Sequence, residues 1–309
     1  MIRYALVRLA QGIPVLLVVA SVTFALLRFL PGGPFDREKA LPPEILANIE
    51  ARYHLDEPLP SQYLRYLAGI LRGDLGPSFK YPGRDVADIL ADSLPVSLQL
   101  GAVALLLSLG LGIGAGLAAG VRGGSLLDRC VMGATLLGIS LPSFVLGAAL
   151  VLGVALGAGW PPAGLWEGPA YVILPALTLA ALPTAYVAQL TRASVLEVVG
   201  RDFVRTARAK GASEARVRWV HVLRNALLAV VTYFGPLLAV LLTGSFVVEQ
   251  IFAIPGIGRF FVTAVTNRDY PLVMGVTLLY AVLVVAANLV VDLLYGWLDP
   301  RIRLGGRET

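Results

Sequence analysis

Few residues in this chain of 309 have side chains suited to nucleophilic or metal chemistry. Cys130 is the only cysteine, and His54 and His221 are the only histidines. A structural zinc centre takes about four Cys or His ligands, so we expect no metal site. Ser140 would need a neighbouring base to act as a nucleophile, but both histidines lie outside the apolar runs of the sequence. We therefore predict no catalytic residue and no enzyme.

Glycine motifs that bind nucleotides are not expected either. The nearest approach to a dinucleotide fingerprint is Gly110-x-Gly112-x-x-Ala115, which has no strand before it and lies inside an uncharged run of 27 residues, 95–121. The sequence contains no Gly-x4-Gly-Lys-Ser/Thr phosphate loop. We therefore expect no cofactor bound by this chain. Gly112, Gly116 and Gly120 are four residues apart, a spacing that lets membrane helices approach closely.

The composition indicates a membrane protein. Hydrophobic residues make up 57% of the chain, charged residues only 15%, and the mean hydropathy is +0.77. An ordinary soluble domain has about 25% charged residues, so this composition excludes a water-soluble enzyme. The net charge of +5 falls between the apolar runs and forms no basic face of a soluble domain, so we expect no nucleic-acid partner.

Six apolar runs are long enough to cross a bilayer core of about 30 Å, which takes roughly 20 helical residues. They are residues 9–30, 95–121, 130–157, 171–191, 225–248 and 270–298. The first is longer than the apolar part of a secretory signal, so we expect a retained helix. Arg28, Glu249 and Asp292 approach the runs only near their ends, where a side chain reaches water. A charge relay of the kind that secondary carriers use is therefore not expected.

The distribution of charge predicts the orientation. The N-terminus, residues 122–129 and 192–224 and the C-terminal end with Asp292 carry 15 Lys+Arg against 7 Asp+Glu. The alternate connections, with Arg28, carry 10 against 13. Because short cytoplasmic loops collect Lys and Arg, both termini are predicted to be cytoplasmic.

The first long connection, residues 31–94, has the pattern of a small external helical subdomain. Pro43 at a helix start, followed by Leu46, Ile49 and Tyr53, indicates one amphipathic helix. A second is indicated by Tyr63, Leu67, Ile70 and Leu71, with Gly73 ending it. Two helices lying flat on the outer leaflet are the alternative.

The cytoplasmic connection 192–224 has the pattern of a helix, a glycine turn and a second helix. Asp202 is predicted to cap a helix that runs to Lys210, and Gly211 to end it in a left-handed conformation. Ser213 is predicted to cap the next helix, which continues into the fifth run. A short exposed basic helix is typical of a docking site for a cytosolic partner. The alternative is a basic loop that touches anionic lipid headgroups.

The outer segment Phe252-Ala-Ile-Pro-Gly-Ile-Gly258 contains a turn-forming Pro255-Gly256 pair. We expect Phe252, Ile254 and Ile257 to project from the outer surface and to be buried by a partner or by the transported molecule. The alternative is that they fold back onto the helices of this chain.

The sequence of the cytoplasmic connection and of several other segments resembles the peptide-type permease subunits of ATP-binding cassette importers. The resemblance is carried by Thr206, Ala207 and Gly211, at the Ala-Ala and Gly of the cytoplasmic "EAA" motif, and by His221-Val-Leu-Arg-Asn225. It continues in Pro31-Gly-Gly-Pro34, Leu55-Asp-Glu-Pro58, Gly73-Asp-Leu-Gly76, Phe252 to Gly258, Arg268-Asp-Tyr-Pro271 and Leu298-Asp-Pro-Arg301, and so covers nearly the whole chain. Two residues differ from the motif: Arg205 stands where the motif has an acidic residue, and Arg224 stands where the broader superfamily often has Pro.

The resemblance implies an all-α integral membrane protein of the type I importer permease fold in the bacterial inner membrane. Its parts are residues 1–30 with the first span, the external subdomain 31–94, a five-helix core 95–298 with the coupling loop 192–224, and the cytoplasmic tail 299–309. The implied partners are a second homologous permease, two cytosolic ATPases that hold ATP and Mg, an external solute-binding protein and membrane lipids. The implied substrates are di- and oligopeptides; nickel chelates or oligosaccharides are the alternative, and a self-contained secondary transporter is a further one.

The resemblance also gives two sets of site residues. The ATPase-coupling residues are Asp202, Arg205, Thr206, Ala207, Arg208, Ala209, Lys210, Gly211, Ser213, His221, Arg224 and Asn225. The external contact residues are Phe252, Ile254, Pro255, Gly256, Ile257 and Gly258.

Overall fold

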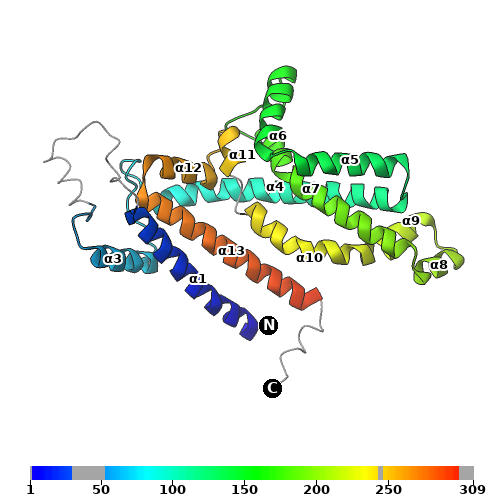
Figure 1. Cartoon of the computed structure of the whole chain (residues 1–309), viewed down its shortest axis with the longest axis horizontal. Helices are drawn as coiled ribbons and strands as arrows, with labels where there is room; N and C mark the ends of the chain where they lie inside the picture. Colours follow the sequence, from blue (N-terminus) through cyan, green and yellow to red (C-terminus); the bar gives the residue numbers. More distant parts are fainter. Residues whose placement is uncertain (1, 30–52, 243–245, 299–309) are drawn as a thin grey trace. The chain divides into compact units, whose positions relative to one another are not determined.

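The computed structural model describes residues 2–29, 53–242 and 246–298, and these residues form helices joined by short connections (Figure 1). Among them the structure contains an isolated bridge between Pro77 and Asp85 but no strand. The helices are α1 (Ile2–Phe29), α3 (Leu59–Arg72), α4 (Val86–Val121), α5 (Leu126–Ser140), α6 (Ser143–Leu150), η1 (Val151–Leu156), α7 (Ala170–Val199), α8 (Asp202–Ala209), α9 (Glu214–Arg216), η2 (Val217–Val222), α10 (Leu223–Leu242), α11 (Phe246–Ile251), α12 (Ile257–Asn267) and α13 (Tyr270–Leu298).

The chain packs as two compact units. The first, which contains the loop 192–224 and is called the loop-bearing unit, comprises Ser97–Ile254 and the C-terminal stretch from Ala286. The second, which contains α1 and α3 and is called the α1–α3 unit, comprises Ile2–Val96 and Pro255–Val285. The division therefore falls inside the helices α4 and α13.

Four helices of the described residues are long and apolar enough to cross a membrane: Leu6–Phe29, Val86–Val121, Ala170–Val199 and Tyr270–Leu293. The pair Leu126–Ser140 and Ser143–Leu156 makes a fifth if the two helices, which meet at 105°, count as one span. The predicted run 225–248 falls on α10 and α11, and residues 243–245 between them lie outside the described residues. The predicted helix 43–53 lies outside them as well, except for Tyr53.

The third predicted run, 130–157, is a broken helix in the structure. Leu141 has the extended backbone angles φ −83° and ψ 119°, and Pro142 has ψ 140°. The ring of a proline disfavours helical angles at the preceding residue, so α5 ends at Ser140 and α6 starts after Pro142. Pro95, in contrast, lies inside α4, which begins nine residues earlier than predicted, at Val86.

Close packing of α4 on α7 confirms the role predicted for the spaced glycines. A Cβ on Gly116 would lie 2.5 Å from the Ala188 carbonyl oxygen and 2.6 Å from Thr191 Cβ. Gly112 and Gly120 approach Val187 and Val195 in the same way. Because a side chain at these positions has no room, glycine sets the distance between the two helices.

Helices α5, α6 and α10 also pack against α7, which makes α7 the central helix of the loop-bearing unit. Helix α11 packs on α6 and α7 and buries Glu249, which we expected to reach water. That expectation is wrong: the Glu249 side chain is fully buried, and its Oε1 accepts a hydrogen bond of 2.8 Å from Ser97 Oγ.

In the α1–α3 unit, helix α3 confirms the second amphipathic helix predicted for residues 31–94. Gly73 follows it with φ +76°, and the Tyr63 hydroxyl lies 2.6 Å from Ser21 Oγ of α1. Leu71, predicted on the apolar face, is 88% exposed; the buried residue of α3 is Gln62. Burial raises the pKa of Tyr66 to about 12.

The core of this unit contains Val86, Ile89, Ile257, Leu272 and Val276. The buried Asp269, just before α13, holds the connection that precedes α4. Its carboxylate accepts hydrogen bonds from the Ser78 hydroxyl and, at 3.1 Å, from the backbone N–H of Phe79.

Filling the contact between α4 and α7 is expected to destabilise the protein. Gly116→Leu places side-chain atoms where Ala188 and Thr191 already lie, with an expected loss of roughly 1–3 kcal/mol of stability. Gly110→Leu is the matched control, because a Cβ there meets nothing within 4 Å. Thermal unfolding in detergent should show a lower midpoint for Gly116→Leu alone, and equal midpoints for the two variants would refute the close packing.

Candidate functional site: the loop between α7 and α10

Helix α8 ends in a glycine turn that satisfies its last carbonyl groups. Gly211 has φ +79°, as predicted. Its N–H donates to the Arg208 carbonyl at 2.9 Å, and the N–H of Ala212 donates to the Ala207 carbonyl at 3.1 Å. These two bonds define a Schellman motif, in which an amino acid with a Cβ would be strained at the glycine position.

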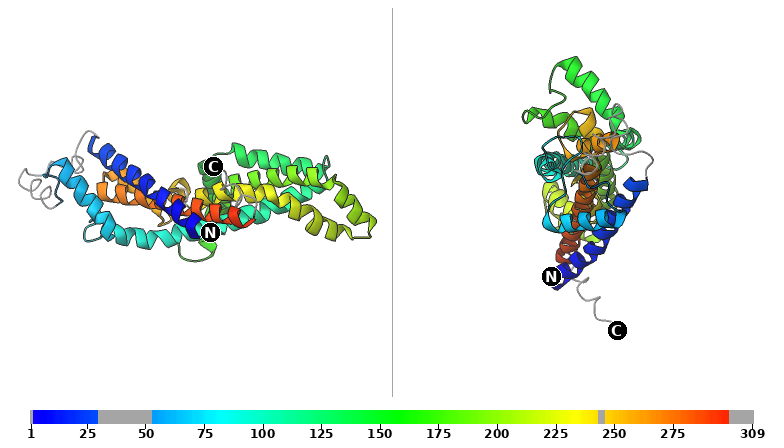
Figure 2. Two further views of the ribbon diagram at one scale, coloured as in Figure 1. Left: turned by 90° about the horizontal axis from the view of Figure 1, so that it is seen from below. Right: turned by 90° about the vertical axis from the view of Figure 1, so that its left-hand side faces the viewer.

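The second helix begins at Ser213, as predicted. The Ser213 side chain accepts a hydrogen bond from the N–H of Arg216. Helix α9 then continues through the π-helical segment η2 into α10, so the chain is helical from Glu214 to Leu242. Figures 1 and 2 show α8 and α9 beyond one end of α7 and α10.

The predicted cap at Asp202 is wrong by one residue. Arg201 has the extended angles of an N-cap, φ −71° and ψ 148°, and Asp202 is already helical. The Asp202 side chain is 97% exposed and lies 3.7 Å from the guanidinium of Arg205, one turn along. Its carboxylate therefore occupies the first turn, where it interacts favourably with the helix dipole.

Val204 attaches α8 to the rest of the unit, and the sequence analysis missed it. Its side chain is fully buried in a cluster with Leu117 of α4, Val195 of α7, and Val217 and Val222 of η2. It is the buried residue of α8. A signal was present in the sequence, because Val204 is one of two large apolar residues among the charges of this helix; the other, Phe203, is 44% exposed.

The structure brings most of the predicted coupling residues to the surface of this loop. Ala207 and His221 are half-buried, and the others are exposed: Asp202, Arg205, Thr206, Arg208, Ala209, Lys210, Gly211, Ser213, Arg224 and Asn225. Asn225 Nδ2 donates to the His221 carbonyl at 2.7 Å, so this side chain stabilises its own helix.

An ion pair links the two helices across the glycine turn. Arg208 Nε lies 2.8 Å from Glu214 Oε1, and this hydrogen bond holds the pKa of Glu214 below its ordinary value. The carboxylate therefore stays charged and bound to Arg208 at neutral pH. The glycine turn and this ion pair thus join the two helices, and the surface that they present is basic and partly apolar.

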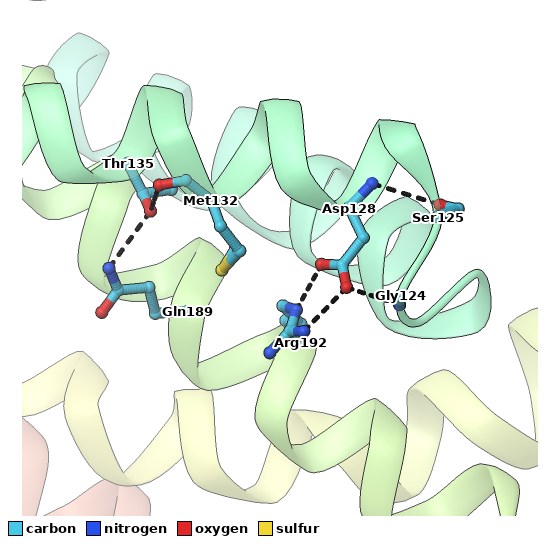
Figure 3. A network of polar contacts seen from close by, with 7 residues as sticks. All are labelled: Gly124, Ser125, Asp128, Met132, Thr135, Gln189 and Arg192. Carbon is cyan, nitrogen blue, oxygen red and sulfur yellow. Dashed lines mark hydrogen bonds and ion pairs between the residues drawn. The ribbon is translucent and has the colours of Figure 1, made fainter.

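A polar network joins α5 to α7 on the side of α7 that leads into the loop (Figure 3). The buried Asp128 carboxylate binds the guanidinium of Arg192 through both oxygens, with 2.7 Å between Oδ2 and Nη2, and also accepts from the N–H of Gly124 at 2.8 Å. Two turns further along α5, Gln189 Nε2 donates to Thr135 Oγ1 at 3.1 Å. The sequence signal was the capping pattern Ser125-x-x-Asp128, in which Ser125 Oγ accepts from the N–H of Asp128.

The external segment does not expose its apolar side chains, so that prediction is wrong. Phe252, Ile254 and Ile257 are fully buried within this chain. Phe252 lies against α6, where a Cβ on Gly147 would be 3.4 Å from its ring, and Ile257 belongs to the core of the α1–α3 unit. Pro255 remains exposed, whereas Gly256 and Gly258 are buried. The side chains fold back onto the helices of the chain because exposing them to water is unfavourable.

Two family models match the sequence. The binding-protein-dependent transport system inner membrane component matches residues 110–304, and its N-terminal counterpart matches residues 1–101. Similar curated proteins are the oligopeptide transport system permease protein OppB of Haemophilus influenzae, 44% identical over 98% of this chain and 100% of that protein, and the dipeptide transport system permease protein DppB of Bacillus subtilis, 43% identical over 98% and 99%.

Solved structures share the fold. The inward-facing MetNI methionine ABC transporter has a TM-score of 0.54 at 20% identity, over 68% of this chain and 96% of the other. An amino acid ABC transporter structure gives 0.52 at 19% identity, over 67% and 92%. The predicted class, an all-α permease fold, is thereby confirmed. The chain belongs to the family of binding-protein-dependent transport system inner membrane components, multi-pass membrane subunits of transport complexes.

The ion pair between α5 and α7 is expected to contribute to stability. Asp128→Asn removes the charge that Arg192 binds, and the thermal unfolding midpoint should fall. Arg192→Gln should lower it as well, and the double variant should lose less than the sum of the two single losses. Additive losses would show that the two side chains do not interact.

Proposed function

We propose that this chain is the peptide-transporting permease subunit of an ATP-binding cassette importer and that α8 is its docking helix for a cytosolic ATPase. The observation that carries the proposal is the attachment of α8: it is exposed and basic on one side and fixed through Val204 to α4, α7 and η2 on the other. A force applied to α8 is transmitted to helices long enough to cross the membrane.

The proposed complex contains a second homologous permease, two ATPases that hold ATP and Mg, and an external solute-binding protein. Both termini and the loop 192–224 are cytoplasmic in this proposal, in agreement with the excess of Lys and Arg in that set of connections. The permease itself performs no catalysis and binds no cofactor.

Peptides are the proposed substrate because the similar proteins with 43–44% identity along the whole chain carry oligopeptide or dipeptide transport in their names. Nickel chelates and oligosaccharides are the alternative substrates, and the test must distinguish them from peptides. A self-contained carrier is the other class of function, and it would transport without any ATPase.

Peptide uptake by the reconstituted complex tests the substrate. Proteoliposomes with both permeases, both ATPases and the binding protein are expected to take up labelled di- to pentapeptides only when ATP is supplied. Uptake of a metal chelate or sugar but not of peptide would contradict the proposed substrate, and uptake by the permease alone would contradict the proposed class.

The glycine turn is expected to be necessary for coupling. Gly211→Val forces a β-branched residue to φ +79°, at a cost on the order of 1–3 kcal/mol, while no atom within 4 Å obstructs the side chain. Substrate-stimulated ATPase activity of the complex should be lost, although the protein still inserts. Gly200→Val is the control, because Gly200 has φ −79° and its nearest neighbour would be 3.9 Å away. Normal stimulation in Gly211→Val would refute the role of the turn.

The orientation is tested by single cysteines in a Cys130→Ala background. Ser61→Cys on α3 and Ala215→Cys on α9 are both at exposed positions. On intact cells, a membrane-impermeant thiol reagent should label the first and not the second. The reverse pattern would overturn the orientation.

A further inference from the structure

A groove lies on the loop-bearing unit at the end of α4. It has a volume of about 340 Å³ and is lined by residues of α4 or its end (Gly114, Leu117, Ala118, Val121 and Arg122) and by residues of η2 (Arg218 and Trp219). Its floor is apolar, and its rim carries two guanidinium groups and an indole.

The groove exists because α4 has two rows of glycines. One row, with Gly116, packs on α7, whereas a Cβ on Gly114 would meet nothing within 4 Å. The described part of the chain therefore leaves the floor of the groove open along one face of α4. The floor is accessible to a narrow apolar chain.

The two guanidinium groups of the rim are only weakly paired within the described residues. Arg218 Nε is buried and has no hydrogen-bond partner among the described residues; its nearest acid, Glu214, is 3.9 Å away and is bound to Arg208. Arg122 forms no ion pair within the described ranges. A buried N–H without an acceptor is costly, so an anionic ligand would satisfy a group that the protein leaves unsatisfied.

The position of the groove indicates which anion binds. The apolar helix Val86–Val121 ends at the groove, and Arg122 is the next residue after it. Trp219 is 62% exposed there, and tryptophan is enriched at membrane interfaces. Guanidinium groups bind phosphate oxygens well, and basic pockets between membrane helices bind acidic lipids.

We propose that this groove binds an anionic phospholipid, with the phosphate between Arg122 and Arg218 and an acyl chain along the α4 face at Gly114. In this arrangement Arg218 binds the phosphate, and Glu214 keeps its ion pair with Arg208. The site depends on the membrane location of the chain and not on the proposed docking of an ATPase.

The test is lipid binding to the delipidated permease complex by native mass spectrometry. Phosphatidylglycerol should bind more tightly than phosphatidylcholine, and Arg122→Gln with Arg218→Gln should weaken the binding of phosphatidylglycerol by about fivefold for each arginine. Arg129→Gln with Arg216→Gln is the control, because it removes the same charge at exposed positions outside the groove. Equal losses in the two double variants, or no preference for the anionic lipid, would overturn the proposal.

Gly114→Leu tests the floor of the groove, with Gly110→Leu as its control at a second open position of α4. Gly114→Leu alone should weaken lipid binding while the partner subunits still co-purify. If Gly114→Leu releases the second permease, the groove is a protein interface and the proposal fails. Displacement of the lipid by millimolar inorganic phosphate would identify the ligand as a free anion and would overturn it as well.

Discussion

The position of helix α8 depends on the burial of one side chain, that of Val204. A helix of eight residues is too short to be stable alone in water, and α8 is rich in charged residues. Val204, in the cluster with Leu117, Val195, Val217 and Val222, supplies the tertiary contact that it needs. The Schellman turn and the pair between Arg208 and Glu214 then fix its direction. The exposed surface of α8 therefore depends on an apolar contact with α4, α7 and η2.

Helix α7 connects this surface to the remainder of the unit. It packs closely on α4 at three glycines, binds α5 through the buried Asp128, and leads directly into α8. Close packing and polar pairs act together here: the glycines bring the backbones near each other, and the ion pair fixes the position of α5 along α7. In the proposed function, a displacement of α8 would reach several helices through these contacts.

Local chemistry was predictable from the sequence, and tertiary contacts were not. Gly211 and Ser213 were predicted correctly because a left-handed turn and an N-cap are properties of a few neighbouring residues. The burial of Val204 depends on residues far away in the chain, and a single apolar residue has no periodicity to reveal its partner. For the same reason Phe252 and Ile254 were expected at the surface, although the helices of the chain bury them. The break at Pro142 is a further case: the apolar run 130–157 shows the length of the segment but not the bend of 105° between its two helices.

The role of Val204 in attaching α8 is tested most directly by the ratio of peptide transported to ATP hydrolysed in the reconstituted complex. Val204→Ala removes part of the buried contact, at a cost of roughly 1.5–3 kcal/mol, while Val220→Ala changes a valine of the same loop that is 48% exposed. We expect this ratio to be lowered several-fold in Val204→Ala and unchanged in Val220→Ala. An unchanged ratio in Val204→Ala, with the protein inserted and the ATPases bound, would contradict the role of Val204.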